Sequence, residues 1–370
     1  TWNGTLTAPN LRGQVDLRDV NFVPQPELDS ITGFNLRMLT RDTDFTIDTG
    51  YGAYNNMPFT LKGTASLVDF EQLTTDLRLV SQGFGSLRAS GSVGADALNM
   101  DIRIDTLMLG LFEPFVTMVD TLDGTLSCDL TLRGSFEDPE INGQLMSRDL
   151  TVKPTLMDST IHGGVIVMTF EGNRVTVDSV YAAVGPGWLL INGSLVVDDQ
   201  ALSDIDLVLT ARNVTFSAEN LCLVTVDSSH LTYRTTPEGY RLAGRLELGE
   251  SRLTANFPWS SILPWVVSVE EVPPDYPEML RQTALDIQVR ESKKLWVDNN
   301  LARIRMHAAL AIVGSVARPT LSGQITIEEG YILYLDRKFD VKTGMVLMTN
   351  PNRFNPEVNF GAEAKVTNYQ

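Results

Sequence analysis

The sequence predicts an all-β fold, a long and strongly curved antiparallel sheet with very few short helices. Three observations predict it. Apolar and polar residues alternate along most of the 370 residues, as they do in strands with one buried and one solvated face. A short Pro-Gly unit recurs three times, which indicates one architectural element used repeatedly. Segments that could form helices are too few to cover a sheet.

Alternation with a period of two residues is the main signal for the individual strands. Successive side chains of a strand point to opposite faces, so each alternating segment has one apolar and one polar face. Parallel strands buried on both faces read instead as continuous apolar runs, so the pattern favours antiparallel pairing. The clearest alternating segments are 100–104, 126–132, 205–209, 285–289, 304–310 and 325–327.

The recurring unit reads Pro-x-aliphatic-x-Gly-Gln-aliphatic and begins at Pro9, Pro139 and Pro319. Proline cannot donate to a ladder and suits the start of a strand. Glycine inside a strand marks a bulge or a bend. We therefore expect the glycines of the three units to occupy equivalent bent positions. They are Gly13, Gly143 and Gly323.

Helical candidates are short: about two turns within 110–121, and short helices around 259–267 and 278–282. Five prolines between 258 and 277 interrupt the strand pattern, and we expect a flap or end cover there. Elsewhere the alternation continues without a linker. The sequence thus predicts one continuous elongated β segment over 1–370, with a Pro-rich interruption at 256–284. Because the chain opens without Met and stops within a strand pattern, we expect a fragment of a longer protein.

The apolar face of such a sheet must be buried against something. Either two sheets pack into a sandwich, or one sheet curls so that its apolar face lines an interior. The repeated units are 130 and 180 residues apart, too uneven for a propeller or a solenoid. We favour one curled sheet with an elongated hydrophobic groove. The residues predicted to line the groove are Ile102, Ile104, Leu130, Leu132, Leu207, Leu209, Ile287, Val289, Ile325 and Ile327. Their neighbours predicted to face water are Asp101, Arg103, Asp129, Thr131, Asp206, Asp286 and Gln288.

Composition excludes several classes of protein. A net charge of −17 argues against nucleic acid, whose phosphates need a Lys/Arg surface, and against adsorption to an anionic membrane face through charge. No stretch approaches the 18 apolar residues of a membrane helix. Cys128 and Cys222 do not settle the compartment, and nothing in the sequence supports or excludes a disulfide between them.

Residues for catalysis or metal binding are not grouped in the sequence. The three histidines have no His or Cys neighbours at the spacing of metal ligands. We expect His307, between Met306 and Ala308, on a solvated strand face. Nucleophile elbows, P-loops and dinucleotide fingerprints are absent from the sequence. We therefore predict no cofactor and no enzyme, unless a site is assembled from distant residues.

The motifs resemble the TamB family and the wider AsmA-like, bridge-like lipid-transfer group. The run Leu122-Asp123-Gly124-Thr125-Leu126, followed by Gly134-Ser135 and by Pro139-Glu140-Ile141-Asn142-Gly143, is similar to a pattern that recurs in those proteins. The order of 314–325, Glu329-Gly330-Tyr331-Ile332, 338–341, 344–346 and 355–358 is similar to their C-terminal region.

The resemblance implies a long β-taco with a hydrophobic groove, in the periplasm of a diderm bacterium. It implies anchoring in the inner membrane through an N-terminal segment outside this sequence. It also implies a partnership with an Omp85-type outer-membrane barrel (TamA-like) through a C-terminal region outside it. The implied function is a conduit for the acyl chains of glycerophospholipids between the inner and outer membranes.

Two other readings stay open. The same groove suits a periplasmic scaffold or chaperone that receives unfolded outer-membrane strands by apolar contact or edge pairing. A β-solenoid spacer would need regular repeats and aromatic stacks. A lipid groove predicts a continuous stripe of aliphatic residues with few charges, whereas a peptide site predicts a local open strand edge.

Overall fold

A computed structural model describes residues 2–5, 8–24, 30–68, 71–95, 97–116, 119–136, 138–155, 160–198, 201–218, 222–256, 278–335, 337–349 and 357–364. Of the described residues, 83% are in strands and 3% in helices, which confirms the predicted all-β class. The residues form two compact units. Unit 1 comprises 1–151, 163–179 and 194–203, and unit 2 comprises 152–162, 180–193 and 204–370.

Unit 1 contains the first nine strands, and the next five strands contribute residues to both units. The first nine are β1 (Trp2–Thr5), β2 (Ala8–Phe22), β3 (Ile31–Arg41), β4 (Asp44–Tyr54), β5 (Met57–Val68), β6 (Gln72–Ser81), β7 (Gly85–Gly94), β8 (Leu98–Met108) and β9 (Val119–Gly134). The next five are β10 (Pro139–Pro154), β11 (Ile161–Gly172), β12 (Arg174–Val184), β13 (Gly187–Asp198) and β14 (Ala201–Ala218).

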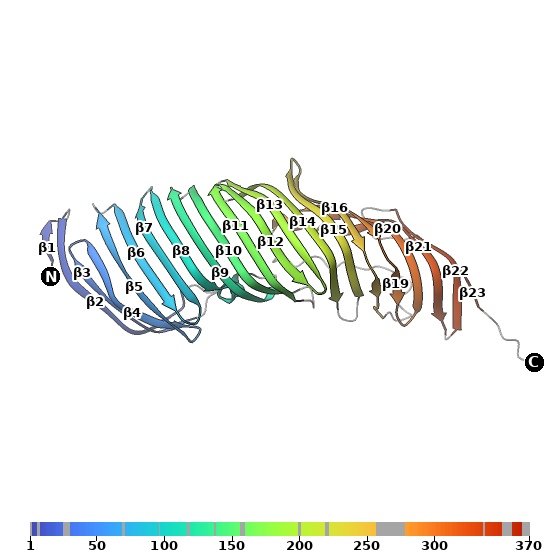
Figure 1. Cartoon of the computed structure of the whole chain (residues 1–370), viewed down its shortest axis with the longest axis horizontal. Helices are drawn as coiled ribbons and strands as arrows, with labels where there is room; N and C mark the ends of the chain where they lie inside the picture. Colours follow the sequence, from blue (N-terminus) through green and yellow to red (C-terminus); the bar gives the residue numbers. More distant parts are fainter. Residues whose placement is uncertain are drawn as a thin grey trace, which may run out of the picture. The chain divides into compact units, whose positions relative to one another are not determined.

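Strands β2 to β9 form an antiparallel meander in chain order (Figure 1). The connections are short, as alternation with frequent turn residues predicts. Asn55 and Asn56 join β4 to β5 with positive φ angles of 47° and 60°. This is the conformation of a two-residue hairpin turn, which asparagine tolerates better than most residues.

Bulges bend this meander along one line. Register shifts fall between Leu17 and Val20, between Ile47 and Gly50, and between Ile104 and Leu107. Similar shifts occur in the β3–β4 and β7–β8 pairs. A bulge leaves one residue unpaired, bends its strand and increases the local twist. The shifts lie at neighbouring register positions in β2–β5 and in β7–β9, while β5–β6 and β6–β7 pair without a shift. They bend the sheet along this line, here called the crease, and the curvature predicted from the sequence arises there.

The three repeated units differ in one respect from their prediction. Pro139 and Pro319 begin β10 and β21. Gly143 and Gly323 share positive φ angles of 133° and 128°, and a Cβ would lie 2.0 Å and 2.2 Å from a carbonyl oxygen of the neighbouring strand. Only glycine allows that approach. Gly13 lacks the positive φ, and a Cβ at this position would meet only the hydroxyl of Thr40, at 3.2 Å. Two of the three units are therefore equivalent.

The last nine strands lie in unit 2. They are β15 (Cys222–Thr236), β16 (Gly239–Leu248), β17 (Ser251–Leu253), β18 (Ala284–Glu291), β19 (Leu295–Asp298), β20 (Ala302–Ser315), β21 (Pro319–Tyr334), β22 (Arg337–Met348) and β23 (Glu357–Glu363). Most pairs are antiparallel, but β16 pairs with β18 and β17 with β19 in parallel. A parallel pair cannot be joined by a tight turn, and the interrupted strand pattern at 256–284 lies between these strands.

Helices are as rare as predicted in the part of the chain that the structure describes. A 3₁₀ helix, η1 (Leu109–Phe115), overlaps the interval 110–121 predicted to form two turns, and α1 (Glu278–Arg281) lies within the predicted 278–282. The candidate at 259–267 lies outside the described residues. One continuous segment over 1–370 stays a prediction.

Candidate functional site

The candidate site is the apolar face of the sheet in each unit. In unit 1, residues in direct cross-strand register share a face, and two rows run from β2 to β9 without a charged residue. The Ile102 row comprises Val15, Met38, Ile47, Gly63, Leu77, Ala89, Ile102 and Leu130. The Ile104 row, along the crease, comprises Leu17, Leu36, Gly50, Leu61, Leu79, Leu87, Ile104 and Cys128.

Side chains of the Ile102 row are half-buried or exposed, and none is fully buried. Val15 is 42% exposed. Hydrophobic residues make up 43% of the chain, yet only twenty-two hydrophobic side chains among the described residues are buried. A dry core between two packed sheets would bury most of them. The described part of the sheet therefore carries apolar rows that protein covers only in part.

The opposite face of unit 1 is charged. Arg78, Arg88 and Arg103 lie in register across β6, β7 and β8. Arg88 donates two hydrogen bonds to Asp76, at 3.0 Å and 2.8 Å, and Arg103 pairs with Asp129. The hydrogen bond from Arg88 lowers the pKa of Asp76. These pairs are exposed and contribute little to stability. They establish which face of the sheet is in water.

An aromatic cluster lies on the apolar face beyond the crease. Phe59 and Phe84 are each 6% exposed and pack with Leu107. Ring centroids lie 6.3 Å apart for Phe34 and Phe59, and 6.3 Å apart for Phe59 and Phe84. Leu111 of η1 packs against the same cluster. Protein side chains thus fill this part of the face, while the Ile102 row is left accessible.

Unit 2 has a corresponding apolar face. The Ile287 row comprises Leu209, Leu231, Gly244, Ile287, Ile312 and Leu321. The Val289 row comprises Ala211, Ser229, Leu246, Val289, Leu310, Gly323 and Met348. Neither row contains a charge. Ile287 and Val289 are buried and pack with Leu231. Ala211 and Met348, which end the Val289 row, are also buried, whereas Leu209 and Leu321, which end the Ile287 row, are half-buried.

The ten residues predicted to line a groove all avoid full exposure. Eight are half-buried, and Ile287 and Val289 are buried. In unit 1, Ile102 lies opposite Leu130 and Met100 opposite Leu132. In unit 2, Ile325 lies opposite Val346, and Ile327 opposite Gly344. Within each unit they share the apolar face. That all ten line one continuous groove stays a prediction.

The seven neighbours predicted to face water are nowhere buried. Asp101, Arg103, Asp129, Asp206 and Gln288 are exposed. Thr131 and Asp286 are partly exposed, and the side chain of Asp286 is 46% exposed in its pair with Arg241. Sequence reasoning missed the aromatic cluster, because its phenylalanines come from separate strands. Their alternation with small residues, as in Pro58-Phe59-Thr60, was the available signal.

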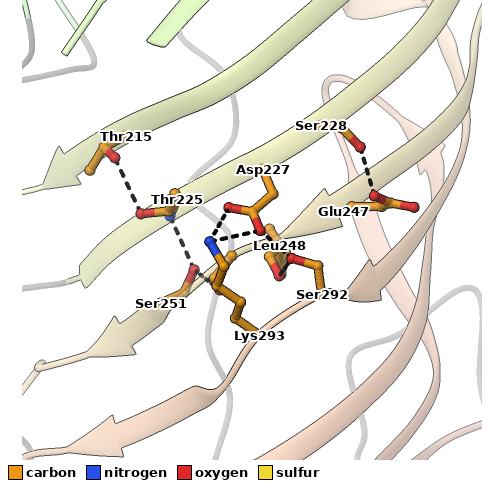
Figure 2. Close-up of polar contacts among 10 residues, drawn as sticks. Thr215, Thr225, Asp227, Ser228, Glu247, Leu248, Ser251, Ser292 and Lys293 are labelled. Atoms are coloured by element: carbon orange, nitrogen blue, oxygen red, sulfur yellow. Dashed lines mark hydrogen bonds and ion pairs between the residues drawn. The ribbon is translucent and has the colours of Figure 1, made fainter. Parts of the chain in front are cut away.

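A network of polar contacts in unit 2 links β15 to the connection between β18 and β19 and so holds the parallel strands together (Figure 2). Asp227 lies at the bulge of β15 between Val226 and Ser228. It accepts a hydrogen bond from the Ser292 hydroxyl and an ion pair from Lys293 at 3.2 Å. The bond from Ser292 lowers the pKa of Asp227. Gly249 leaves room for this carboxylate, since a Cβ there would lie 2.3 Å from its oxygen.

The same network of polar contacts extends to β17 and β14. Ser251 accepts a hydrogen bond from the Thr225 backbone N–H at 3.1 Å, and the hydroxyls of Thr215 and Thr225 lie 3.2 Å apart (Figure 2). The polar groups of this network serve as hydrogen-bond or ion-pair partners for one another, as polar groups with a structural role do. They hold β15, β17 and the β18–β19 connection in place, and they offer no free nucleophile or base.

The part of the chain that the structure describes holds no group of three or more His, Cys, Asp or Glu side chains arranged for a metal ion. Cys128 is a free, buried thiol whose pKa is raised by burial, which makes it less reactive. Shifted carboxylate pKa values belong to surface pairs such as Asp16 with Arg37.

The fold and the two faces define a class of protein: an all-β protein whose sheet carries uncharged apolar rows on one face and charged residues on the other. Residues 181–370 match the TamB C-terminal domain, and residues 60–146 match the TamB N-terminal domain. The first match spans more than half of the chain, so this chain belongs to the TamB family. TamB proteins are transport and assembly modules of the bacterial envelope. No solved structure matches the chain significantly. Among the described residues, no helix is long and apolar enough to cross a membrane.

Proposed function

We propose that the apolar faces hold the acyl chains of glycerophospholipids that pass between the inner and outer membranes through the periplasm. The observation that carries the proposal is the Ile102 row: eight uncharged positions in register across eight strands, none of them fully buried. Burial of one methylene contributes about 0.8 kcal/mol. An acyl chain along this row would be held by the burial of its apolar surface area alone.

The absence of charge in the row also favours movement. A ligand that exchanges one aliphatic contact for another as it slides meets no fixed polar anchor, so its free energy changes little along the row. Strands lie about 4.8 Å apart, and eight strands span roughly 34 Å between the first and the last. That length exceeds one extended acyl chain.

Family membership supports transport, and an Omp85-type, TamA-like barrel partner and an inner-membrane anchor are part of the proposal. The alternative, a periplasmic scaffold or chaperone for outer-membrane proteins, would place unfolded peptide on the same face. Peptide backbone carries polar groups that an uncharged aliphatic row cannot satisfy. The Ile102 row therefore favours hydrocarbon.

Mass spectrometry of molecules that co-purify with the protein tests the proposal. We expect diacyl glycerophospholipids at one or more per chain after extraction in mild detergent. A parallel purification of Ile102→Asp should carry less lipid. Protein that carries peptide and no phospholipid would establish the chaperone alternative and refute the conduit.

A further inference from the structure

The ladder between β18–β19 and β20 is interrupted in unit 2. Residues 284–290 of β18 pair with 315–309 of β20, and residues 295–298 of β19 pair with 306–303. His307 and Ala308 lie between these two registers and have no backbone partner in β18 or β19. Ala308 itself is buried, so its backbone N–H would be an orphan and needs another acceptor.

Glu291 supplies the acceptor and binds His307 as well. One carboxylate oxygen of Glu291 accepts from the Ala308 N–H. The other lies 2.5 Å from Nδ1 of His307. Nε2 of the same imidazole lies 3.1 Å from a carboxylate oxygen of Glu328 on β21. An ionised carboxylate only accepts, so both ring nitrogens must donate, which requires the protonated imidazolium.

Other charged groups surround the imidazole. Arg305 of β20 pairs with Glu328 and Glu329 of β21. The remaining charged groups near the interruption are Glu250 after β16, Arg290 of β18, and Lys293 and Lys294 of the β18–β19 connection. Lys293 pairs with Asp227 and Glu250 with Arg252. The pKa of His307 is raised, chiefly by its hydrogen bond to Glu291.

We propose that His307 is a pH-dependent latch. It links the end of β18, through Glu291, to β20 and β21, and so regulates the apolar face on either side of the interruption. Val289 and Leu295 flank the interruption, and both are buried on the apolar face. Neutral imidazole has one N–H and can donate to Glu291 or to Glu328, but not to both. Loss of the proton releases one of the two carboxylates.

The direction of the pH effect follows from the raised pKa. A group whose folded pKa lies above its unfolded value stabilises the fold fully below the unfolded pKa, about 6.5 for histidine. That stabilisation is lost as pH rises through the higher folded pKa. The latch is therefore closed in mildly acidic solution and opens in alkaline solution.

Hydrogen exchange at the Ala308 amide tests the latch without lipid. We expect its protection factor to fall by about two- to fivefold between pH 6 and pH 8.5, the range that exposed ion pairs give. Protection factors rather than rates are compared, since chemical exchange itself depends on pH. The effect on lipid rests on the proposed function, whereas this measurement does not, so the two can fail separately.

Two variants separate titration of His307 from other effects of pH. His307→Lys keeps a cation that can donate to both carboxylates, so protection should stay high at both pH values. His307→Ala has no side-chain donor at either pH, so protection should be low and independent of pH. A pH dependence that persists in His307→Ala, or equal protection in all three proteins, would overturn the latch.

Discussion

Aspartate in place of Ile102 is expected to leave unit 1 folded and to remove most of its retained lipid. Ile102 is half-buried in an accessible row, so a carboxylate there can reach water, and the expected loss of stability is about 1–2 kcal/mol. Hydrocarbon beside the charge would have to withdraw. A loss of four methylene contacts costs about 3 kcal/mol, which weakens binding about a hundredfold.

Thr60→Asp is the matched control. Thr60 is exposed on the charged face of β5, opposite Val80, and the substitution adds the same charge without touching the apolar row. Circular dichroism should give the same strand content for both variants, and bound phospholipid per chain should fall only in Ile102→Asp. If Ile102→Asp unfolds, the row is a dry core; if it folds and keeps its lipid, the row does not bind acyl chains.

Phe59→Ala should give the largest loss of stability in unit 1. Phe59 is 6% exposed and lies in the centre of the aromatic cluster, between Phe34 and Phe84. Removing a buried phenylalanine leaves a cavity and costs about 3–5 kcal/mol. The cluster lies beyond the crease and fills its part of the face with protein. We therefore expect a stability defect that lowers lipid retention only as far as unit 1 unfolds.

Phe112→Ala is the control for that measurement. Phe112 lies on η1 and is 38% exposed, so its removal should change the free energy of unfolding by less than about 0.5 kcal/mol. Urea unfolding followed by circular dichroism compares the two variants. Equal effects of the two substitutions would show that the aromatic cluster does not stabilise the sheet.

Period-two alternation predicted the strands and their two faces because it reports local backbone geometry. Ile102 and Ile104 alternate with Asp101, Arg103 and Asp105 in the sequence, and the structure gives them half-buried and exposed environments in the same order. Each such segment fixes its own faces without reference to the strand beside it. That is why the ten predicted lining residues avoid the charged face.

Features that depend on which strands meet could not be predicted. Phe34, Phe59 and Phe84 lie 25 residues apart in the sequence and become neighbours only through the register of β3 to β7. The parallel pairing of β16 with β18 depends on a long connection, and alternation does not distinguish it from antiparallel pairing. The same holds for His307, whose two carboxylates come from β18 and β21.

Site-specific photo-crosslinking tests the central claim most directly, that acyl chains lie on the apolar face. Benzoylphenylalanine would replace Leu77 or Leu207 on that face, and Arg78 or Asp206, the adjacent residues on the charged face. The protein would be irradiated with vesicles of phosphatidylethanolamine and phosphatidylglycerol, and adducts read by mass spectrometry. We expect phospholipid adducts at Leu77 and Leu207 and none at Arg78 and Asp206. Equal adducts on both faces, or none at Leu77 and Leu207, would contradict the account.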